Sequence, residues 1–250
     1  MLKQGRHERI VTVLHQQGRV QVADLVARLD VSEDTVRRDL GELAAMGVLQ
    51  RVHGGAILRP LTAPFAERLL DESGAKGAIA AVAARLARDG QLLLLDSGTT
   101  VLAIARRFPV DLKATVFTTS VPVAAALSNH PSVEVHMIGG RLLKAAQATV
   151  GVPAVESIKR VRADLCFLGI CSLDIELGIT VSDPDEAEVK RVMVAQAAEV
   201  VAAAESDKLN TAGPYLVDPI TAITYLVTDE SVAGDLLAPY QAQGIQVLQG

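Results

Sequence analysis

The sequence predicts two domains of different class: a small helical domain ending in a β-hairpin at residues 1–59, and an α/β domain with a mostly parallel sheet at residues 76–250. Helical periodicity in the first part gives way to two strand-like runs around His53-Gly54-Gly55. Strand-like and helical segments then alternate after residue 76, which is typical of α/β folds. Between them, residues 60–75 contain Pro60 and Pro64 without a sustained period, and therefore predict a linker.

Charge and composition restrict the classes of function. The chain has a net charge of −5, but residues 1–59 carry nine Lys/Arg against seven Asp/Glu, so the small domain alone is mildly positive. Aromatic residues make up only 3% and Trp is absent, which argues against a surface that stacks single-stranded bases. No apolar run reaches eighteen residues, so we expect a soluble, cytoplasmic protein without a membrane partner. Cys166 and Cys171 lack metal-site spacing; we expect both to be reduced and buried, and we expect no metal or cofactor.

Three helices are expected in the small domain. The first two cover His7–Gln17 and Val20–Leu29. After a brief turn, Ser32 has the chemistry of an N-cap for the third. Two short helices followed by a tight turn and a capped basic helix form a helix-turn-helix pattern. The run VLQRVHGGAIL then predicts a wing, a hairpin with Gly54-Gly55 as its turn.

The stretch SEDTVRRDL, residues 32–40, has the chemistry of DNA recognition. Val36 and Leu40 lie on the apolar stripe of the expected helix, whereas Arg37 and Arg38 project from it. Guanidinium groups suit both phosphate oxygens and a guanine edge. An ordinary charged helix face has the same composition, but the flanking helices and wing favour DNA binding. The expected DNA-contacting residues are Ser32, Thr35, Arg37, Arg38, Arg51 and His53.

Apolar strands and helices alternate through the second part of the chain, which predicts a mostly parallel sheet with helices on both faces. The expected strands lie in QLLLLDSGTT, ATVFTTS and VEVHMIGGR and at residues 163–169, 199–204, 223–227 and 245–248; the expected helices cover residues 76–89, 121–128 and 185–198, with one more beginning near residue 231.

Three of the expected strands end in small, hydroxyl-bearing or glycine-rich loops: DSGTT, TTS and GGR. Ligands of open α/β sheets bind outside the carboxyl ends of the strands. The Ser97–Thr100 loop offers backbone amides and hydroxyls to an anion such as phosphate. Each loop alone could be a structural turn, but three loops at one sheet edge favour a ligand crevice. Arg141 and Lys208 are the cations expected to complete it, although either could be a solvated surface charge.

The chain resembles the DeoR family of transcriptional regulators in both parts. Residues 6–58 resemble its N-terminal domain, and residues 76–229 resemble its effector domain. The first resemblance rests on Ser32, Thr35, Val36, Arg37, Arg38, Asp39, Leu40 and His53-Gly54-Gly55-Ala56. The second rests on Asp96-Ser97-Gly98-Thr99-Thr100, Ile138-Gly139-Gly140, Asp164, Phe167-Leu168-Gly169, Glu188, Lys190-Arg191, Lys208 and Thr228-Asp229.

The resemblance implies a winged helix-turn-helix that binds double-stranded operator DNA, and a sensor related in fold to ribose-5-phosphate isomerase that binds phosphorylated sugars or related metabolites. The chain departs from the family pattern in two places: Thr118-Thr119-Ser120 stands where the family has Thr-Asn-Ser, and Glu205-Ser206-Asp207-Lys208 stands where it has Asp-Ser-Ser-Lys. The expected effector-binding residues are Asp96, Ser97, Gly98, Thr99, Thr100, Thr119, Ser120, Gly139, Gly140, Arg141, Lys190 and Lys208.

Three functions are consistent with the sequence. The leading one is a sequence-specific transcriptional regulator, more often a repressor in this family, that acts as a dimer or tetramer and is controlled by a small phosphorylated metabolite. The second is a phosphosugar isomerase-like enzyme carrying a DNA-binding domain, with Asp96, Asp183 or Glu186 as the base. No committed acid partners these carboxylates in the sequence, and no Gly-Lys-Ser/Thr phosphate loop is present. The third is a constitutive DNA-binding protein with an inert assembly domain.

Overall fold

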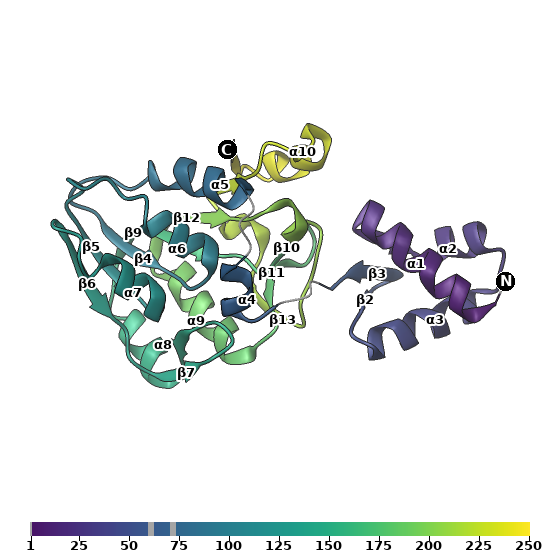
Figure 1. The fold of residues 1–250 in the computed structure, drawn as a ribbon. Helices are drawn as coiled ribbons and strands as arrows, with labels where there is room; N and C mark the ends of the chain where they lie inside the picture. Colours follow the sequence, from purple (N-terminus) through teal and green to yellow (C-terminus); the bar gives the residue numbers. More distant parts are fainter. Residues whose placement is uncertain (1, 60–62, 71–73) are drawn as a thin grey trace.

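The structure, a computed structural model, describes residues 2–59, 63–70 and 74–250. Two lobes follow one another along the chain, a small N-terminal lobe and a larger α/β lobe that contains the C-terminus (Figure 1). Pro60, near the start of the expected linker, lies outside the described residues. No helix of the described chain is both long and apolar enough to cross a membrane.

The small lobe is the expected winged helix-turn-helix. Its elements are α1 Lys3–Gln17, β1 Arg19–Gln21, α2 Val22–Leu29, α3 Glu33–Ala45, β2 Leu49–Val52 and β3 Gly55–Leu58. The side chains of Ile10, Leu14, Val36 and Leu40, at helical spacing on α1 and α3, are fully or almost fully buried in a core of their own.

The wing differs from the sequence-based expectation in two respects. Residues 19–21, expected partly as helix, form a third strand, and the sheet has the order β1-β3-β2. The tip of the hairpin is His53-Gly54 rather than Gly54-Gly55, because Gly55 belongs to β3 and pairs with Gln21. A Cβ at Gly55 would collide with the carbonyl oxygen of Val20, so glycine allows β1 to approach β3 this closely.

The large lobe contains a seven-stranded sheet in the order β15-β14-β12-β9-β4-β5-β6, and every pair of neighbouring strands is parallel. The mostly parallel sheet is therefore confirmed. Its strands are β4 Leu92–Leu95, β5 Ala114–Thr118, β6 Val133–Met137, β9 Ala163–Gly169, β12 Ala197–Ala203, β14 Tyr225–Thr228 and β15 Gln246–Gln249.

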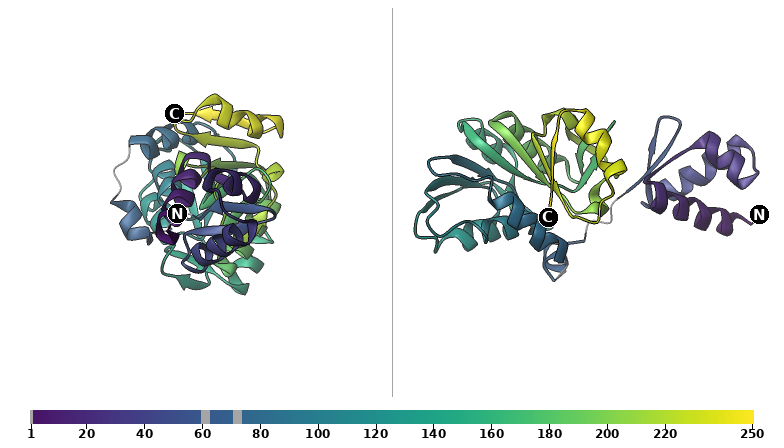
Figure 2. Two further views of the ribbon diagram at one scale, coloured as in Figure 1. Left: turned by 90° about the vertical axis from the view of Figure 1, so that its right-hand side faces the viewer. Right: turned by 90° about the horizontal axis from the view of Figure 1, so that it is seen from above.

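Helices cover both faces of this sheet, as seen from above in the right panel of Figure 2. Successive strand residues point to opposite faces, so Leu93 and Leu95 enter one core with α5, α6 and α7, whereas Leu94 enters the other with α8, α9 and α10. The helices are α5 Gly74–Ala84, α6 Thr99–Ala105, α7 Val121–Leu127, α8 Val152–Ile158, α9 Pro184–Ala195 and α10 Gly234–Ala242, with single 3₁₀ turns at Ser206–Lys208 and Ile220–Ala222.

Two small antiparallel sheets were not expected from the sequence. One is the hairpin of β7 Arg141–Leu143 and β8 Ala148–Val150. The other has the order β10-β11-β13 and is formed by β10 Ser172–Asp174, β11 Gly178–Val181 and β13 Tyr215–Asp218. Their strands have three or four residues each, too short for a clear alternation in the sequence.

Part of the expected linker belongs to the large lobe. Residues Phe65–Leu69 form the short helix α4. The Phe65 side chain is 2% exposed and lies in the core beside α5 and α6. Its backbone N–H donates to the carbonyl oxygen of Ala145, between β7 and β8, at 2.9 Å. The chain thus docks on the large lobe soon after it leaves the wing.

The two lobes also touch directly. Arg19 of β1 pairs with Asp174 at 3.0 Å and with Glu176 at 2.5 Å, both in the β10–β11 hairpin. Leu58 of β3 forms a bridge with Thr211, and its carbonyl oxygen accepts from the Ala212 N–H at 3.2 Å. The wing sheet is therefore held against the large lobe by a backbone hydrogen bond and by ion pairs.

We expect Arg19→Ala to loosen this docking, because it leaves the nearly buried Asp174 carboxylate without its cation. The loss should be about 1–3 kcal/mol of docking free energy, seen by small-angle scattering as a larger radius of gyration. Arg28→Ala, an exposed change on α2, is the matched control. An unchanged radius would show that the Leu58–Ala212 backbone contact suffices.

Candidate functional site

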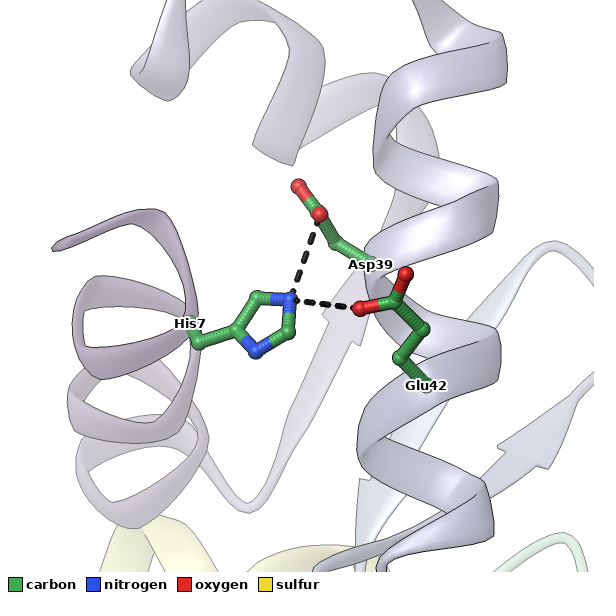
Figure 3. Close-up of side chains that lie close together, drawn as sticks. All are labelled: His7, Asp39 and Glu42. Atoms are coloured by element: carbon green, nitrogen blue, oxygen red, sulfur yellow. Dashed lines mark hydrogen bonds and ion pairs between the residues drawn. The ribbon is translucent and has the colours of Figure 1, made fainter. Parts of the chain in front are cut away.

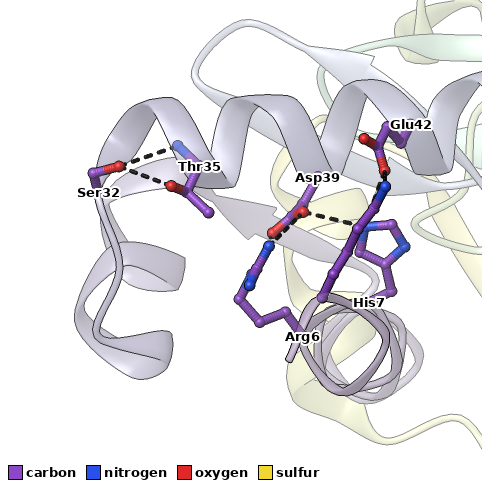
Figure 4. A network of polar contacts seen from close by, with 7 residues as sticks. Arg6, His7, Ser32, Thr35, Asp39 and Glu42 are labelled. Carbon is purple, nitrogen blue, oxygen red and sulfur yellow. Dashed lines mark hydrogen bonds and ion pairs between the residues drawn. The ribbon is translucent and has the colours of Figure 1, made fainter. Parts of the chain in front are cut away.

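Helix α3 presents the residues that the sequence assigns to DNA. Ser32 is its N-cap: the hydroxyl accepts from the Thr35 N–H at 3.3 Å and lies 2.9 Å from the Thr35 hydroxyl (Figure 4). Both side chains therefore help to begin the helix, whatever they do on DNA. Arg37 is half exposed and pairs with Glu33 one turn earlier, Nε to Oε1 at 2.8 Å.

Three other expected DNA contacts are exposed. Arg38 lies on α3 with no ion pair to any described residue. Arg51 lies on β2 beside α3, with a guanidinium nitrogen 3.9 Å from where a Cβ on Gly41 would lie, and His53 lies at the wing tip. The surface formed by α3 and the wing thus carries cations and a histidine that a phosphate backbone and base edges could engage.

A buried polar network fixes α3 against α1. Asp39 is 1% exposed, and its carboxylate accepts from Arg6 Nε at 2.7 Å and Arg6 Nη2 at 3.0 Å (Figure 4). His7 Nε2 lies 3.2 Å from Asp39 Oδ1, the oxygen that also accepts from Arg6 Nη2. Burial favours the neutral form of Asp39, but the hydrogen bonds from Arg6 and His7 outweigh it and hold its pKa below the usual 3.8. This network sets the angle at which α3 is presented.

His7, Asp39 and Glu42 bring three possible metal-ligand atoms within 4.8 Å of one another (Figure 3). The same carboxylates are already neutralised by protein cations, since Arg6 holds Asp39 and Lys3 pairs with Glu42 at 2.6 Å. A metal ion would have to displace both. We therefore assign the cluster to the packing of α1 on α3.

The large lobe contains a cavity of about 270 Å³ at the carboxyl ends of β4 and β9. This is where ligands of parallel sheets bind, and the volume suits a small metabolite. Its lining combines hydroxyls, small residues and charged groups from five parts of the chain. The lining residues are Ala63, Arg68, Ser97, Gly98, Thr99, Thr100, Leu143, Ala145, Ala146, Gly169, Ile170, Cys171, Ser182, Asp183, Glu186 and Lys190.

A buried ion pair forms the floor of this cavity. Lys190 Nζ contacts Asp96, donates to the Gly169 carbonyl oxygen at 2.8 Å, and lies 3.4 Å from Glu186. Burial disfavours the charged amine, but the charges of Asp96 and Glu186 outweigh it and raise the Lys190 pKa, so the amine stays protonated. Lys190 is therefore bound to the protein on several sides.

The structure brings only some of the expected effector-binding residues together. Ser97, Gly98, Thr99, Thr100 and Lys190 line the cavity, and Asp96 lies behind Lys190. Gly98 has φ of +123°, which L side chains rarely adopt, so the loop conformation depends on glycine. Lys208 lines an adjoining hollow of about 70 Å³ and pairs there with Asp207.

The other expected residues lie outside this lining. Ser120 caps α7 by accepting from the Val123 N–H, and Thr119 is buried with its carbonyl oxygen bonded to Thr149 N. Arg141 is exposed and paired with Asp185 of α9, so it is a surface charge in this structure. The remaining two are Gly139 and Gly140, in the loop that leads into β7.

Sequence reasoning did not assign several of the lining residues to the ligand site. Ala63 and Arg68 were assigned to the linker, and Asp183 and Glu186 were considered only as enzymatic bases. Asp183 caps α9, its carboxylate accepting from the Glu186 N–H at 3.0 Å. Cys171 was expected to be buried and is instead partly exposed in the cavity wall, whereas Cys166 is buried as expected; both are free thiols. Although part of the residue is exposed, desolvation of its thiol in the cavity wall and the Glu186 charge raise the pKa of Cys171 to about 12, so it is a neutral thiol.

Comparisons with known proteins agree in both lobes. Residues 6–60 match the DeoR-like helix-turn-helix domain, and residues 71–230 match the DeoR C terminal sensor domain. The chain belongs to the DeoR family. Its small lobe is thus the DNA-binding domain and its large lobe the sensor domain of a transcriptional regulator.

Whole-length relatives in the DeoR family include three named regulators. The HTH-type transcriptional regulator GlpR of Haloferax volcanii is 33% identical over 100% of this chain and 99% of its own. The transcriptional repressor GlcR of Bacillus subtilis is 32% identical over 92% and 89%, and the glycerol-3-phosphate regulon repressor of Haemophilus influenzae 30% over 92% and 90%. A ribose 5-phosphate isomerase A from Methanocaldococcus jannaschii shares 15% identity over 54% of this chain and 53% of its own, at a TM-score of 0.40, too low to bear on function.

We expect Asp39→Asn to destabilise the DNA-binding domain by roughly 1–3 kcal/mol at pH 7, because a hydrogen-bonded charge is lost beside Arg6. A carboxyl whose folded pKa is lowered contributes stability above its unfolded pKa and loses it as pH falls through the folded value. The difference between wild type and variant should therefore shrink below about pH 4. Urea unfolding from pH 7 to pH 3 measures it, with exposed Asp34→Asn as control. Equal stabilities at pH 7 would contradict the assignment.

We expect Arg38→Ala to weaken operator binding by about 1–3 kcal/mol, because Arg38 has no competing ion pair to a described residue. Arg37→Ala should cost less, since Glu33 competes for its guanidinium. Binding to an operator selected from random duplexes, compared with unselected duplexes, separates base reading from phosphate contact. Arg160→Ala, exposed on the sensor domain, is the control. Wild-type affinity in both α3 variants would mean that α3 does not read the operator.

Proposed function

We propose that this chain is a transcriptional repressor whose affinity for operator DNA changes when a small phosphorylated metabolite binds in the sensor cavity. The observation that carries the proposal is the cavity itself, which lies at the carboxyl ends of β4 and β9 in a chain whose other domain binds DNA. An anion-binding loop at such a strand end is a common phosphate site in α/β proteins.

The chemistry of the lining supports a ligand with both an anionic group and hydroxyls. Thr99 and Thr100 line the cavity and the adjoining hollow, and no hydrogen bond to a described residue engages the Thr100 hydroxyl. Asp183 and Glu186 supply carboxylate oxygens that can accept from sugar or polyol hydroxyls. Arg68 and Lys190 supply positive charge. A relative named as the glycerol-3-phosphate regulon repressor supports the same class of ligand.

The enzyme alternative receives less support from the geometry. Asp96 is held by Lys190 and by the Gly169 N–H, Asp183 caps α9, and Glu186 faces Lys190. Each carboxylate considered as a base thus has a structural partner. Proton abstraction needs a base that can reach the substrate and an acid beside it. The relatives named above are regulators, which points the same way.

Assembly forms part of the proposal. We infer that the protein acts as a homo-oligomer, because the DNA-binding domain carries a net charge of only +2 and its short helix α3 carries only two arginines. Two such domains can bind half-sites roughly 34–36 Å apart, or a multiple of that distance. An effector can shift operator affinity only if it binds the DNA-competent and incompetent arrangements with different affinity.

We expect Thr100→Val to lower effector affinity by about five- to tenfold, because it removes one hydroxyl at nearly constant volume. Calorimetric titration of the full chain with a panel of phosphorylated sugars and polyols, glycerol 3-phosphate included, provides the measurement. Thr115→Val, on β5 and outside the cavity, is the control. Unchanged affinity in Thr100→Val would move the ligand to another part of the sensor, and turnover of the ligand would favour the enzyme alternative.

A further inference from the structure

The wall of the sensor cavity includes residues from the segment that joins the two domains. Ala63 and Arg68 both line it, and Arg68 lies on α4, ten residues after the last residue of β3. Phe65 anchors α4 by burying its ring in the sensor core, and its backbone N–H bonds to Ala145, which also lines the cavity. The cavity is therefore closed on one side by the chain that leads to the DNA-binding domain.

Arg68 is the cation of this lining that has no ion pair to a described residue. Its Nε donates to the Ala63 carbonyl oxygen at 3.0 Å, and its guanidinium carbon lies 5.9 Å from the centre of the Phe65 ring. Neither of these two partners is a carboxylate. The other cation of the lining, Lys190, is held by Asp96 and Glu186. An anion entering the cavity would thus find its charge partner in Arg68.

The position of Arg68 adds to this argument. It lines both the main cavity and the adjoining hollow, where Lys76 and Lys208 also lie, and it shares this double position with Thr99, Thr100 and Ile170. The side chains of Asp183 and Glu186 line only the main cavity. The junction of the two spaces therefore carries one cation, Arg68, and the hydroxyls of Thr99 and Thr100. The lysines of the hollow are paired there with carboxylates, Lys76 with Glu205 and Lys208 with Asp207.

We propose that Arg68 binds the phosphate of the effector together with the Ser97–Thr100 loop, so that the ligand joins the interdomain segment to the sensor core. This inference rests on the proposed function of the cavity. A planar guanidinium with free Nη donors can hold two phosphate oxygens at once. Bound in this way, the phosphate links α4 to the loop after β4, and the hydroxyl-bearing part of the ligand extends toward Asp183 and Glu186. The segment that carries the DNA-binding domain is then itself part of the binding site.

The test uses inorganic phosphate, the group common to all ligands of the proposed class, and the full chain. Phosphate binding is followed by ³¹P NMR titration and by the rise in melting temperature relative to chloride at equal ionic strength. We expect Arg68→Ala to weaken phosphate binding roughly ten- to hundredfold. Arg68→Lys should recover part of the loss, because it restores the charge but not the fork. Arg106→Ala, an equal charge change on the exposed end of α6, should bind as wild type does.

A structural role for Arg68 would give a different pattern. Loss of its contact with Phe65 would lower the melting temperature in chloride and phosphate alike, leaving the difference between the two salts unchanged. Such a result, or wild-type phosphate affinity in Arg68→Ala while Thr100→Val is impaired, would overturn the role of Arg68 and leave the cavity as the effector site. Absence of phosphate-specific binding in the wild-type chain would overturn both the inference and the proposed function.

Discussion

The buried pair of Lys190 and Asp96 organises the carboxyl end of the parallel sheet. Asp96 follows β4, and its carboxylate also accepts from the Gly169 N–H at the end of β9, while Lys190 reaches from α9 to the Gly169 carbonyl oxygen. Buried charges are tolerated only when paired and hydrogen-bonded, so these partners must stay together. A side chain at Gly169 would collide with the Ser97 carbonyl oxygen. The two strand ends thus lie close together, and the cavity opens above them.

The sequence was sufficient to predict the helices and strands whose formation depends on residues adjacent in the chain. Ser32 begins α3 through its own first turn, and the apolar runs that end at Leu95 and Gly169 form strands in the sheet. Strand β1 could not be predicted in this way, because three residues are too few for an alternation to indicate a strand, and its pairing with β3 depends on residues far away in the sequence. The same limit explains Arg141, whose partner Asp185 lies 44 residues away in the sequence.

The same distinction between local and long-range signals applies to the candidate site. The Ser97–Thr100 loop could be predicted because a strand, a glycine and hydroxyls are adjacent in sequence, and it does line the cavity. The opposite wall could not, because Ala63 and Arg68 reach the cavity only through the burial of Phe65 in the core. Two prolines made this stretch resemble a connection without structure of its own.

The contact between the wing and the sensor domain limits how freely family members could exchange parts. Arg19 meets Asp174, Leu58 pairs with Thr211, and a side chain at Gly18 would lie 2.7 Å from the Cβ of Asn210. A DNA-binding domain grafted from a relative would bring its own residues to these positions. A chimera built by cutting only between residues 59 and 63 would therefore join two surfaces that had not been selected together. A working hybrid regulator would need the β10–β11 turn and the chain around Asn210 to be exchanged along with the recognition helix.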